Sequence, residues 1–400
     1  MRVLAISEHY FPIIGGSTNY VFNLCKSLSE IGCETFLVTI PDDKNPVNEW
    51  YSEENFHVYR LNIPNFLRKE RYFPFITASK INEIIDEVRP DVIHFVHGFF
   101  APLITRLNQN IRSKPIIWTI QNVPSYEDKL DYFRKVKPLH SFLEPIYLAI
   151  ADVYGHFALK VSKYDLLICV SRNTSDAVHA RNVPRDKIKI IPNGVDIELF
   201  TPKIKTDPEE LGIKGRHPLI LTVAGLTPTK GLHILINSAK RVVEEHPNAL
   251  FLIIGPVRSE RYYLDLKRRI NSLNLEGNIK IIPGVAQDKI NKYFSLCDVY
   301  VQPSLQEGFC MAVLEAMSCG KAVIGTKTGA IPQLIEESEG GLVVEPGSSR
   351  QLRDTLLELL TNDEGRKKMG LKGNKYVAEN YSWRKIAEKT LALYRRVSRG

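Results

Sequence analysis

Two glutamates with unusual surroundings occur in the segment QPSLQEGFCMAVLEAMSCGKAV (302–323). Residues from about Cys310 to Cys319 have helical character, so Glu307 precedes the helix and Glu315 lies about two turns further on, on roughly the same side. A carboxylate accepts paired hydrogen bonds from vicinal hydroxyls, which a ribose or a hexose presents. Two glutamates at this spacing usually form a solvated face, but apolar residues flank Glu315 on both sides. The pattern therefore favours a site for a sugar or a nucleoside.

Two strand-to-helix loops have features of phosphate sites. Gly15 and Gly16 follow the first apolar run, and Lys230 precedes a helix that begins near Leu232. The free N–H groups at a helix N-terminus attract anions, and a lysine beside them adds a positive charge. Taken alone, the glycine pair fits an ordinary tight turn equally well, and Lys230 fits a solvated loop. On this reasoning both loops are candidate diphosphate sites.

Two histidines, His94 and His97, lie in the segment DVIHFVHGFFAP. His97 follows the predicted strand at its carboxyl end, where parallel sheets bind ligands, and is a functional candidate. His94 lies inside the strand and is expected to be a core residue. The six cysteines form no C-x-x-C pair, and no cysteine–histidine cluster has the spacing of zinc ligands. We therefore expect buried thiols and no metal site.

Short apolar, β-branched runs alternate with amphipathic stretches of helical period, such as Leu232–Glu245. A first series of predicted strands comprises residues 3–6, 35–40, 91–96, 115–120, 166–170 and 187–192. A second series comprises residues 219–224, 249–255, 279–284, 298–304 and 321–326. Near-continuous apolar strands that alternate with helices are typical of parallel sheets covered on both faces. The predicted fold class is therefore α/β, with two doubly wound domains.

A stretch without strand character separates the two series of strands. Residues 198–217 are rich in proline and glycine, and we interpret them as a linker. The predicted domains are therefore 1–197 and 218–382. The last helix, Trp383–Val397, is amphipathic and requires a surface on which to pack.

The composition is that of an ordinary globular protein. Of the 400 residues, 44% are hydrophobic and 24% are charged, which excludes disordered and collagen-like classes. The start of the chain lacks the apolar region of a signal peptide, and no apolar stretch is long enough to span a membrane. We therefore expect a cytoplasmic protein.

The formal net charge of +8 is concentrated near the end of the chain. Residues 366–399 contain eleven basic residues and only two acidic ones, Glu379 and Glu388. Since each cation near an anionic leaflet contributes roughly 1 kcal/mol, these helices predict peripheral binding to the inner face of the membrane. A solvated helical face is the competing interpretation. No recognition motif indicates nucleic acid as a partner.

Four segments, in this order, resemble the retaining glycosyltransferases of family four. They are FPIIGGSTNYVFNLCKSL (11–28), IPNGVD (191–196), PSLQEGFCMAVLEAMSCGKAVIG (303–325) and YSWRKIAEKTLALY (381–394), and the resemblance covers nearly the whole chain. The pair of glutamates is its most specific part. The resemblance implies a GT-B fold, in which two Rossmann-like domains with parallel sheets face each other across a cleft. It also implies that residues 383–400 cross back onto the first domain, which holds the acceptor.

The resemblance also implies roles for residues at matching positions. Lys230 contacts the donor diphosphate, Glu307 binds hydroxyls of the donor sugar, and Glu315 binds the ribose of the nucleotide. His97 lies beside the donor sugar, so Glu307 and His97 are the expected catalytic residues. Backbone N–H groups at two helix N-termini bind the phosphates. The full expected donor-binding set is Gly15, Gly16, Lys230, Glu307, Gly308, Phe309, Cys310, Met311, Ala312 and Glu315.

Several positions depart from the family pattern. The family commonly has G-R-L before the lysine, and this chain has Gly225 in place of that arginine. Because a charge-assisted hydrogen bond contributes roughly 1.5–3 kcal/mol, we expect weaker donor binding by about one to two decades. The histidines are spaced H-x-x-H rather than H-x-H, which leaves both His94 and His97 as matches for the functional histidine. Thr119-Ile120-Gln121 replaces the common T-x-H, and Gln333 replaces a glutamate, so the acceptor chemistry is expected to differ.

The implied reaction is the transfer of a sugar from a UDP or GDP sugar to an acceptor hydroxyl, with retention of the anomeric configuration. A glycan or a lipid-linked precursor of the cell envelope is the expected acceptor. No Asp-x-Asp motif is present, so we expect a metal-independent enzyme without a cofactor. A nucleotide-sugar epimerase of the same fold is the nearest alternative. It would consume donor without an acceptor, so an elongated acceptor distinguishes the two. The missing arginine leaves a second alternative, a non-catalytic partner of an active transferase.

Overall fold

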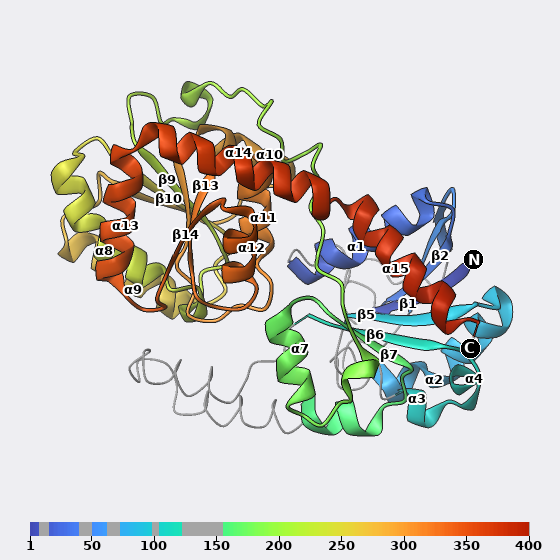
Figure 1. Cartoon of the computed structure of the whole chain (residues 1–400). Helices are drawn as coiled ribbons and strands as arrows, with labels where there is room; N and C mark the ends of the chain where they lie inside the picture. The colour runs from blue at the N-terminus through green and yellow to red at the C-terminus, as the bar shows by residue number, and fades with distance from the viewer. Residues whose placement is uncertain (8–15, 40–49, 62–72, 98–103, 122–154, 400) are drawn as a thin grey trace. The chain divides into compact units, whose positions relative to one another are not determined.

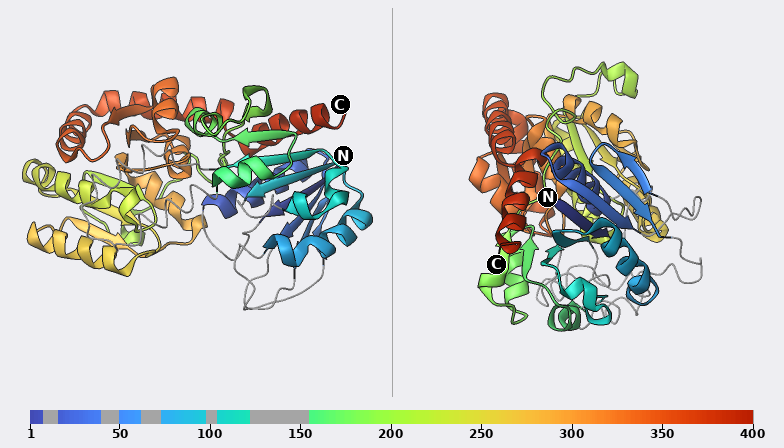
Figure 2. Two further views of the ribbon diagram at one scale, coloured as in Figure 1. Left: turned by 90° about the horizontal axis from the view of Figure 1, so that it is seen from below. Right: turned by 90° about the vertical axis from the view of Figure 1, so that its right-hand side faces the viewer.

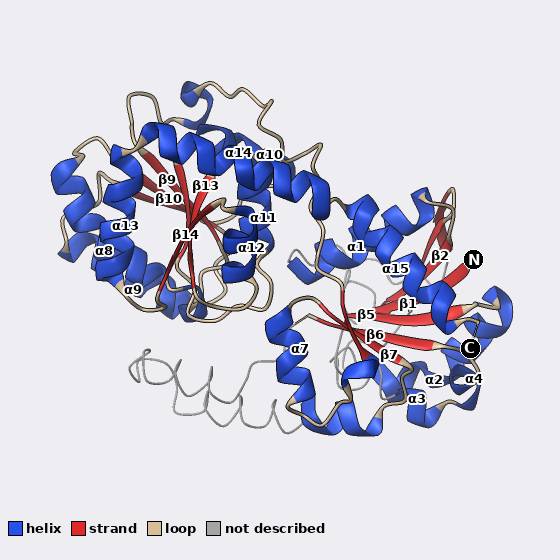
Figure 3. Cartoon of the chain, viewed as in Figure 1, coloured by secondary structure: helices blue, strands red, loops and turns tan. Residues whose placement is uncertain are grey.

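The structure of the chain is a computed structural model that describes residues 1–7, 16–39, 50–61, 73–97, 104–121 and 155–399. The described residues divide into two compact units. The first contains the chain up to Gly194 and again from Trp383 onward, and the second contains residues between Val195 and Ser382. Figure 1 and Figure 3 show that each unit has strands at its centre and helices around them.

The first unit is built on a sheet of eight described strands, in the order β3-β4-β2-β1-β5-β6-β7-β8. The strands are β1 (Arg2–Ser7), β2 (Glu34–Thr39), β3 (Trp50–Glu53), β4 (Phe56–Arg60), β5 (Val92–His97), β6 (Ile116–Ile120), β7 (Leu166–Cys169) and β8 (Ile188–Ile190). Among these strands, β3 and β4 pair antiparallel and all other neighbours pair parallel. β1 is buried from Val3 to Ser7 and β6 over its whole length, which explains their continuous apolar sequences.

Helices cover both faces of this sheet (Figure 1 and Figure 2). On one face, α1 (Gly16–Glu30) and α15 (Trp383–Val397) pack against each other. The other face carries a helical stretch over residues 155–161 and the helices α2 (Phe73–Val88), α3 (Ile104–Leu107), α4 (Gln109–Arg112) and α7 (Arg172–His179). α15 buries Ile386, Thr390 and Leu393, as its amphipathic pattern predicted.

The second unit is built on six described strands, all parallel, in the order β11-β10-β9-β12-β13-β14. They are β9 (Leu219–Val223), β10 (Leu250–Ile254), β11 (Ile279–Ile282), β12 (Val299–Gln302), β13 (Ala322–Thr326) and β14 (Gly341–Val344). One face is covered by α8 (Leu232–Glu245), α9 (Glu260–Ser272) and α13 (Ser349–Thr361). The other is covered by α10 (Gln287–Leu296), α11 (Met311–Ser318), α12 (Ile331–Ser338) and α14 (Asp363–Asn380).

The predicted α/β class with two parallel sheets is confirmed, but three strands were not predicted. β3 and β4 form a hairpin at the edge of the first sheet, where a strand needs no continuous apolar run. β14 is a short edge strand that begins with Gly341. A Cβ at Gly341 would lie 1.9 Å from the carbonyl oxygen of Val323, so the close strand pairing requires a glycine that weakens the sequence signal.

The cysteines are free thiols, of which Cys310 is partly exposed and the other five are buried, as expected. Within the described part of the chain, no group of three or more His, Cys, Asp or Glu residues is arranged to hold a metal ion. None of the described helices is long and apolar enough to cross a membrane.

Candidate active site

Lys230 and Glu307 come from neighbouring strands of the second unit. Lys230 ends the turn η6 (Pro228–Lys230) between β9 and α8, and Glu307 lies in the loop between β12 and α11. β9 and β12 are parallel neighbours, so their carboxyl ends lie at the same edge of the sheet. The Lys230 Nζ is 2.6 Å from the Glu307 Oε1, and the Glu307 side chain is only 6% exposed. The two predicted residues thus form an ion pair at the edge where doubly wound sheets bind ligands.

The same carboxylate oxygen of Glu307 accepts two further hydrogen bonds. Ser304 donates its hydroxyl to Oε1 over 2.8 Å, and the Gln302 amide nitrogen donates to it over 3.2 Å. The Tyr300 hydroxyl in turn donates to the side-chain oxygen of Gln302 over 2.5 Å and so orients the amide. Oε1 therefore has three donors, while Oε2 has no partner among the residues that the structure describes. Oε2 is the atom that can accept a hydroxyl of a ligand.

Lys230 keeps its charge although it is largely buried. Burial by itself lowers the pKa of an ammonium group, but the carboxylate of Glu307 acts in the opposite direction and outweighs it. The pKa of Lys230 consequently lies above its usual value, and the side chain is cationic at physiological pH. An ammonium group has three N–H donors and Glu307 uses one of them, so others can bind an anion.

Two glycines with left-handed backbones allow the loop of Glu307 to approach its neighbours. Gly231 has a φ of +62°, and a Cβ there would lie 1.9 Å from the carbonyl oxygen of Pro303. Gly329 has a φ of +56°, and a Cβ there would lie 2.6 Å from the carbonyl oxygen of Glu307. A larger residue at either position would displace the loop that carries the carboxylate. A glycine is therefore required at position 231 both by the left-handed backbone and by the close packing.

The helix α11 begins next to this ion pair, after Gly308 and Phe309. Its N-cap Cys310 has a left-handed backbone with a φ of +75°. In the described structure the N–H groups of Met311 and Ala312 have no hydrogen-bond partner, as is usual in a first helical turn. Such N–H groups form the positive end of the helix dipole and attract anions. The structure thus brings Lys230, Glu307 and residues 308–312 together in one unit.

Glu315 lies on the buried side of α11. Its residue surface is 8% exposed, and burial raises the pKa of its carboxyl group to about 7. Its charge acts on the thiol of Cys310, as do those of Glu307 and Lys230, which places all four groups in one region. A carboxyl group with a pKa near neutrality can either accept or donate a hydrogen bond to a hydroxyl, depending on pH.

The candidates of the first unit are only partly described. Gly16 begins α1, and the backbone of His97 ends β5. Gly15 and the side chain of His97 lie outside the described residues. His94 is fully buried, with one ring nitrogen 2.7 Å from the Thr119 hydroxyl and the other bonded within the same core. The expectation that His94 is a core histidine is therefore confirmed.

Gly225, which replaces the family's arginine, borders another arginine of the same chain. A Cβ at Gly225 would lie 3.4 Å from the Cγ of Arg258. The adjacent residues Leu226 and Val257 form an isolated parallel bridge, which holds the two loops together. The lack of a side chain at Gly225 thus leaves room for the aliphatic part of Arg258.

Three residues that shape this site were not predicted from the sequence. Gln302 and Ser304 orient Glu307, and Gly329 makes room for its loop. The hydroxyl of Thr326 supports the loop further by donating to the carbonyl oxygen of Ser304 over 2.6 Å. In the sequence, Gln302 and Ser304 could have been noticed as two polar residues directly at the carboxyl end of a buried strand.

Comparison with known families accounts for almost the entire chain. The family described as Glycosyl transferases group 1 matches residues 203–389, and the family described as Glycosyltransferase Family 4 matches residues 14–199. The chain belongs to these glycosyltransferases. The family predicted from four segments is confirmed, and the protein is a transferase enzyme.

Relatives and solved structures are similar to this glycosyltransferase over its full length. An uncharacterised glycosyltransferase of Methanocaldococcus jannaschii is 27% identical, with 100% of this chain and 99% of that protein covered. Sucrose-phosphate synthase from Thermosynechococcus elongatus has a TM-score of 0.80 at 19% identity, with 99% and 98% covered. HepE of Anabaena in complex with UDP-glucose has a TM-score of 0.76 at 19% identity, with 98% and 99% covered. These likenesses show that the glycosyltransferase has the GT-B fold.

Proposed function

We propose that this glycosyltransferase moves a sugar from a UDP or GDP sugar to an acceptor hydroxyl with retention of the anomeric configuration. The proposed acceptor is a glycan or a lipid-linked precursor of the cell envelope. The observation that carries the proposal is the Lys230–Glu307 pair at 2.6 Å beside the N-terminus of α11. HepE, which shares the fold, was solved with UDP-glucose, so UDP-glucose is the first donor to test.

The groups around the pair suit the parts of such a donor. Lys230 and the N–H groups of Met311 and Ala312 provide positive charge for a diphosphate. The unoccupied oxygen of Glu307 can accept a hydroxyl of the donor sugar. Glu315, further along the same helix, can bind the hydroxyls of the ribose. This assignment follows the family resemblance and is consistent with the geometry of the unit.

The chemistry of transfer depends on charge that appears at the leaving group. When the anomeric C–O bond breaks, both bonding electrons stay with the diphosphate, whose negative charge increases in the transition state. Lys230 and the N–H dipoles of α11 are in place beforehand and stabilise that charge. For retention, the acceptor oxygen bonds to the anomeric carbon on the face that the diphosphate leaves. The acceptor's proton then passes to an oxygen of the leaving phosphate.

Contact with an anionic membrane through the basic stretch 366–399 stays a prediction. The stretch is divided between α14 in the second unit and α15 in the first. On α14, Arg366, Lys367 and Lys372 form ion pairs with acidic residues. Lys368 and Lys375 of α14 are exposed and have no ion pair among the described residues. Arg395 and Arg396 of α15 are exposed too, so both helices offer charge to a lipid surface.

The experiment that tests the proposal measures donor binding and sugar transfer on the same variants. Lys230→Ala and Glu307→Ala are titrated with UDP-glucose and GDP-mannose by calorimetry and assayed for elongation of acceptors in a lipid extract. Removing Lys230 is expected to weaken donor binding about 10- to 100-fold, since a charge-assisted hydrogen bond contributes roughly 1.5–3 kcal/mol. Lys292→Ala is the matched control, because it removes an exposed ion pair with Glu210 from the same unit.

The outcomes separate the proposal from its alternatives. An elongated acceptor in the native chain supports a transferase of the proposed kind, and its anomeric configuration tests retention. Donor consumption without an acceptor would indicate an epimerase, and a native chain that binds no uridine or guanosine diphosphate would favour a non-catalytic partner. Near-native transfer by both Lys230→Ala and Glu307→Ala would show that the site lies elsewhere.

A further inference from the structure

Three parallel strands of the first unit begin at one edge of its sheet, and a cation stands shortly before each. Arg112 ends α4 before β6, Lys163 comes shortly before β7, and Lys187 directly precedes β8. The register of the three strands places their starts side by side. This edge is opposite the carboxyl ends of the strands, where His97 ends β5 and where the family's donor and acceptor are expected.

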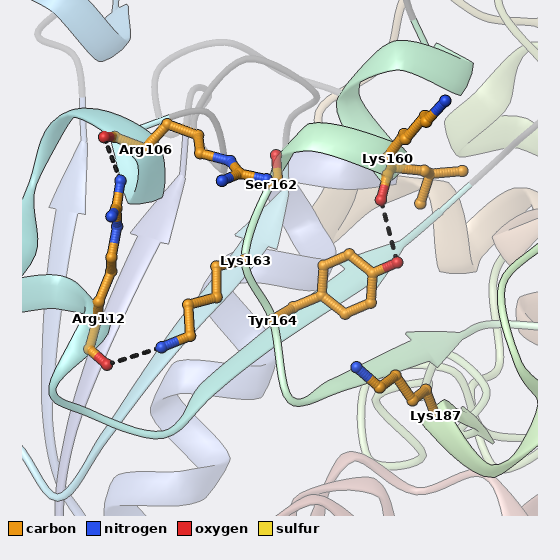
Figure 4. Close-up of a pocket in the computed structure, with 8 residues that line it drawn as sticks. Arg106, Arg112, Lys160, Ser162, Lys163, Tyr164 and Lys187 are labelled. Carbon is orange, nitrogen blue, oxygen red and sulfur yellow. Dashed lines mark hydrogen bonds between the residues drawn. The ribbon is translucent and has the colours of Figure 1, made fainter.

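A cavity of about 390 Å³ lies at this edge and is lined mainly by cations (Figure 4). Its basic residues are Arg106, Arg112, Lys160, Lys163 and Lys187. No acidic residue of the described chain belongs to its lining. The volume is within the range of small-molecule sites, and the charge favours an anionic occupant.

The cations of this cavity have no carboxylate partner in the described structure. Arg112 donates to the carbonyl oxygen of Thr105 over 2.6 Å, and Lys163 donates to that of Arg112 over 3.2 Å. Arg106 likewise donates to a backbone carbonyl, and the Lys187 Nζ lies 5.8 Å from the ring of Tyr164. Carbonyl groups and rings satisfy hydrogen bonds but do not cancel a formal charge. The positive charge therefore remains uncompensated, unlike that of nearby Arg185, which pairs with Asp176.

A buried hydroxyl without a partner lines the same cavity. Ser162 is only 7% exposed, and its Oγ has no hydrogen-bond partner among the described residues. Leaving a buried polar group unsatisfied destabilises a protein, so such a group in a native structure calls for an explanation. An oxygen of a bound anion would accept the hydroxyl's hydrogen and provide one.

We propose that this cavity binds phosphate groups, either of a free diphosphate-like anion or of a phospholipid headgroup. Guanidinium and ammonium groups are the donors that phosphate oxygens prefer, and five residues that carry them line this cavity. The Ser162 hydroxyl adds a neutral donor among them. This site is separate from Lys230 and Glu307, which belong to the second unit, and the proposal does not rest on the proposed function.

Helix capping alone explains only part of the arrangement. Arg106 and Arg112 lie in the last turns of α3 and α4, where cations interact favourably with terminal carbonyl groups. That role leaves the Ser162 hydroxyl unsatisfied. It also does not involve Lys187, whose ammonium has no hydrogen bond or ion pair in the described structure.

The test neutralises the two lysines whose ammonium groups bond nothing in the described fold. Lys160→Gln/Lys187→Gln is compared with Lys26→Gln/Lys114→Gln, which removes the same charge from residues of the same unit outside the cavity. Pyrophosphate binding is measured by calorimetry in a Lys230→Ala background, which reduces any contribution from the candidate active site. Vesicles of phosphatidylcholine, with and without phosphatidylglycerol, are used for co-sedimentation with the full chain.

We expect Lys160→Gln/Lys187→Gln, the cavity variant, to bind pyrophosphate or phosphatidylglycerol vesicles about 30-fold more weakly. Each cation near anionic groups contributes about fivefold to the affinity. A loss confined to pyrophosphate identifies a free phosphate ligand, and a loss towards phosphatidylglycerol vesicles identifies a lipid headgroup. Ser162→Ala keeps every charge but removes one hydrogen bond. It is expected to lower the affinity for the same probe about fivefold. The proposal is overturned if the cavity variant binds both probes as tightly as the control variant.

The experiment distinguishes this site from the proposed transferase site. If Lys230→Ala leaves pyrophosphate binding unchanged while the cavity variant abolishes it, the proposed function loses support and the cavity site stands. If the opposite occurs, the cavity site fails and the transferase site stands. Thermal unfolding of each variant shows whether the chain remains folded.

Discussion

The imidazole of His94 lies 2.6 Å from the hydroxyl of Tyr394, which follows it 300 residues later in the chain. The other ring nitrogen bonds the hydroxyl of Thr119 over 2.7 Å, and all three side chains are almost completely buried. Burial lowers the pKa of His94 to about 3, so the ring is neutral and uses one nitrogen as donor and the other as acceptor. This polar contact attaches the last helix, α15, to the central sheet of the first unit.

Replacing Tyr394 by phenylalanine is expected to destabilise the first unit. The change leaves a buried nitrogen of His94 without a partner, which costs about 1–3 kcal/mol. Urea unfolding can be followed by tryptophan fluorescence, because all three tryptophans, Trp50, Trp118 and Trp383, belong to this unit. Tyr263→Phe is the control, since no hydrogen bond of the Tyr263 hydroxyl is found in the described structure. Equal unfolding midpoints for the two variants would contradict the role of the contact.

The first unit should lose stability in acid through His94. Its pKa is lowered from 6.5 to about 3 by burial, so the unfolded state binds the proton more readily than the folded state does. The stabilisation is complete above pH 6.5 and is lost as the pH falls towards 3. Tryptophan fluorescence at a fixed urea concentration should therefore show unfolding of this unit over that range. Tryptophan fluorescence that stays constant from pH 7 to pH 4 at that urea concentration would contradict the assigned role of His94.

The second unit should show the opposite dependence through Glu315. Burial raises the pKa of Glu315 from 4.5 to about 7, so the folded state holds the proton more tightly than the unfolded state. Its stability is then greatest below pH 4.5 and falls as the pH rises through 7, by up to about 3 kcal/mol. Glu315→Gln should remove this dependence when unfolding is followed by circular dichroism. The control Glu276→Gln changes an exposed glutamate of the same unit and should retain it.

Two glycine-to-alanine variants separate backbone strain from steric clash. Gly212 and Gly231 have nearly equal φ values of +63° and +62°, but only a Cβ at Gly231 would meet another group, the carbonyl oxygen of Pro303. Gly212→Ala should cost about 1–2 kcal/mol, the usual penalty of a left-handed conformation. Gly231→Ala should cost more and should also abolish donor binding, because the loop of Glu307 must move. The packing argument would be refuted if both variants had the same free energy of unfolding and both bound donor as the native chain does.

Restoring an arginine at position 225 should strengthen donor binding. The backbone there is not left-handed, and a Cβ would lie 3.4 Å from the Cγ of Arg258 and 4.0 Å from the carbonyl oxygen of Pro256. If the diphosphate lies beside Lys230, Gly225→Arg should bind UDP-glucose about 10- to 100-fold more tightly. Gly225→Ala adds the Cβ without the guanidinium and should bind as the native chain does. Calorimetry that finds no difference between the two variants would place the diphosphate elsewhere.

Local patterns in the chain predicted much of the fold and the main residues of the candidate site. The helical period identified α8 and α15, and apolar runs identified the central strands of both sheets. β3 and β4, which form a hairpin at one edge of the first sheet, lack a continuous apolar run, and the edge strand β14 begins with a glycine, so these three strands were missed. Glu307 and Lys230 were singled out by type and position. Nothing local indicated that Gln302 and Ser304 would share one oxygen of Glu307 with Lys230.

The amino-acid order alone therefore led to the family, the fold class and the residues that can bind a sugar and a diphosphate. These properties depend on residue types at short spacings, which determine helices, strands and turns. Three-dimensional folding was needed to join His94 to Tyr394, Lys230 to Glu307, and the cations of the phosphate-binding cavity to one another. Parallel strands bring residues tens or hundreds of positions apart to the same edge of a sheet, and no local period in the sequence records that meeting.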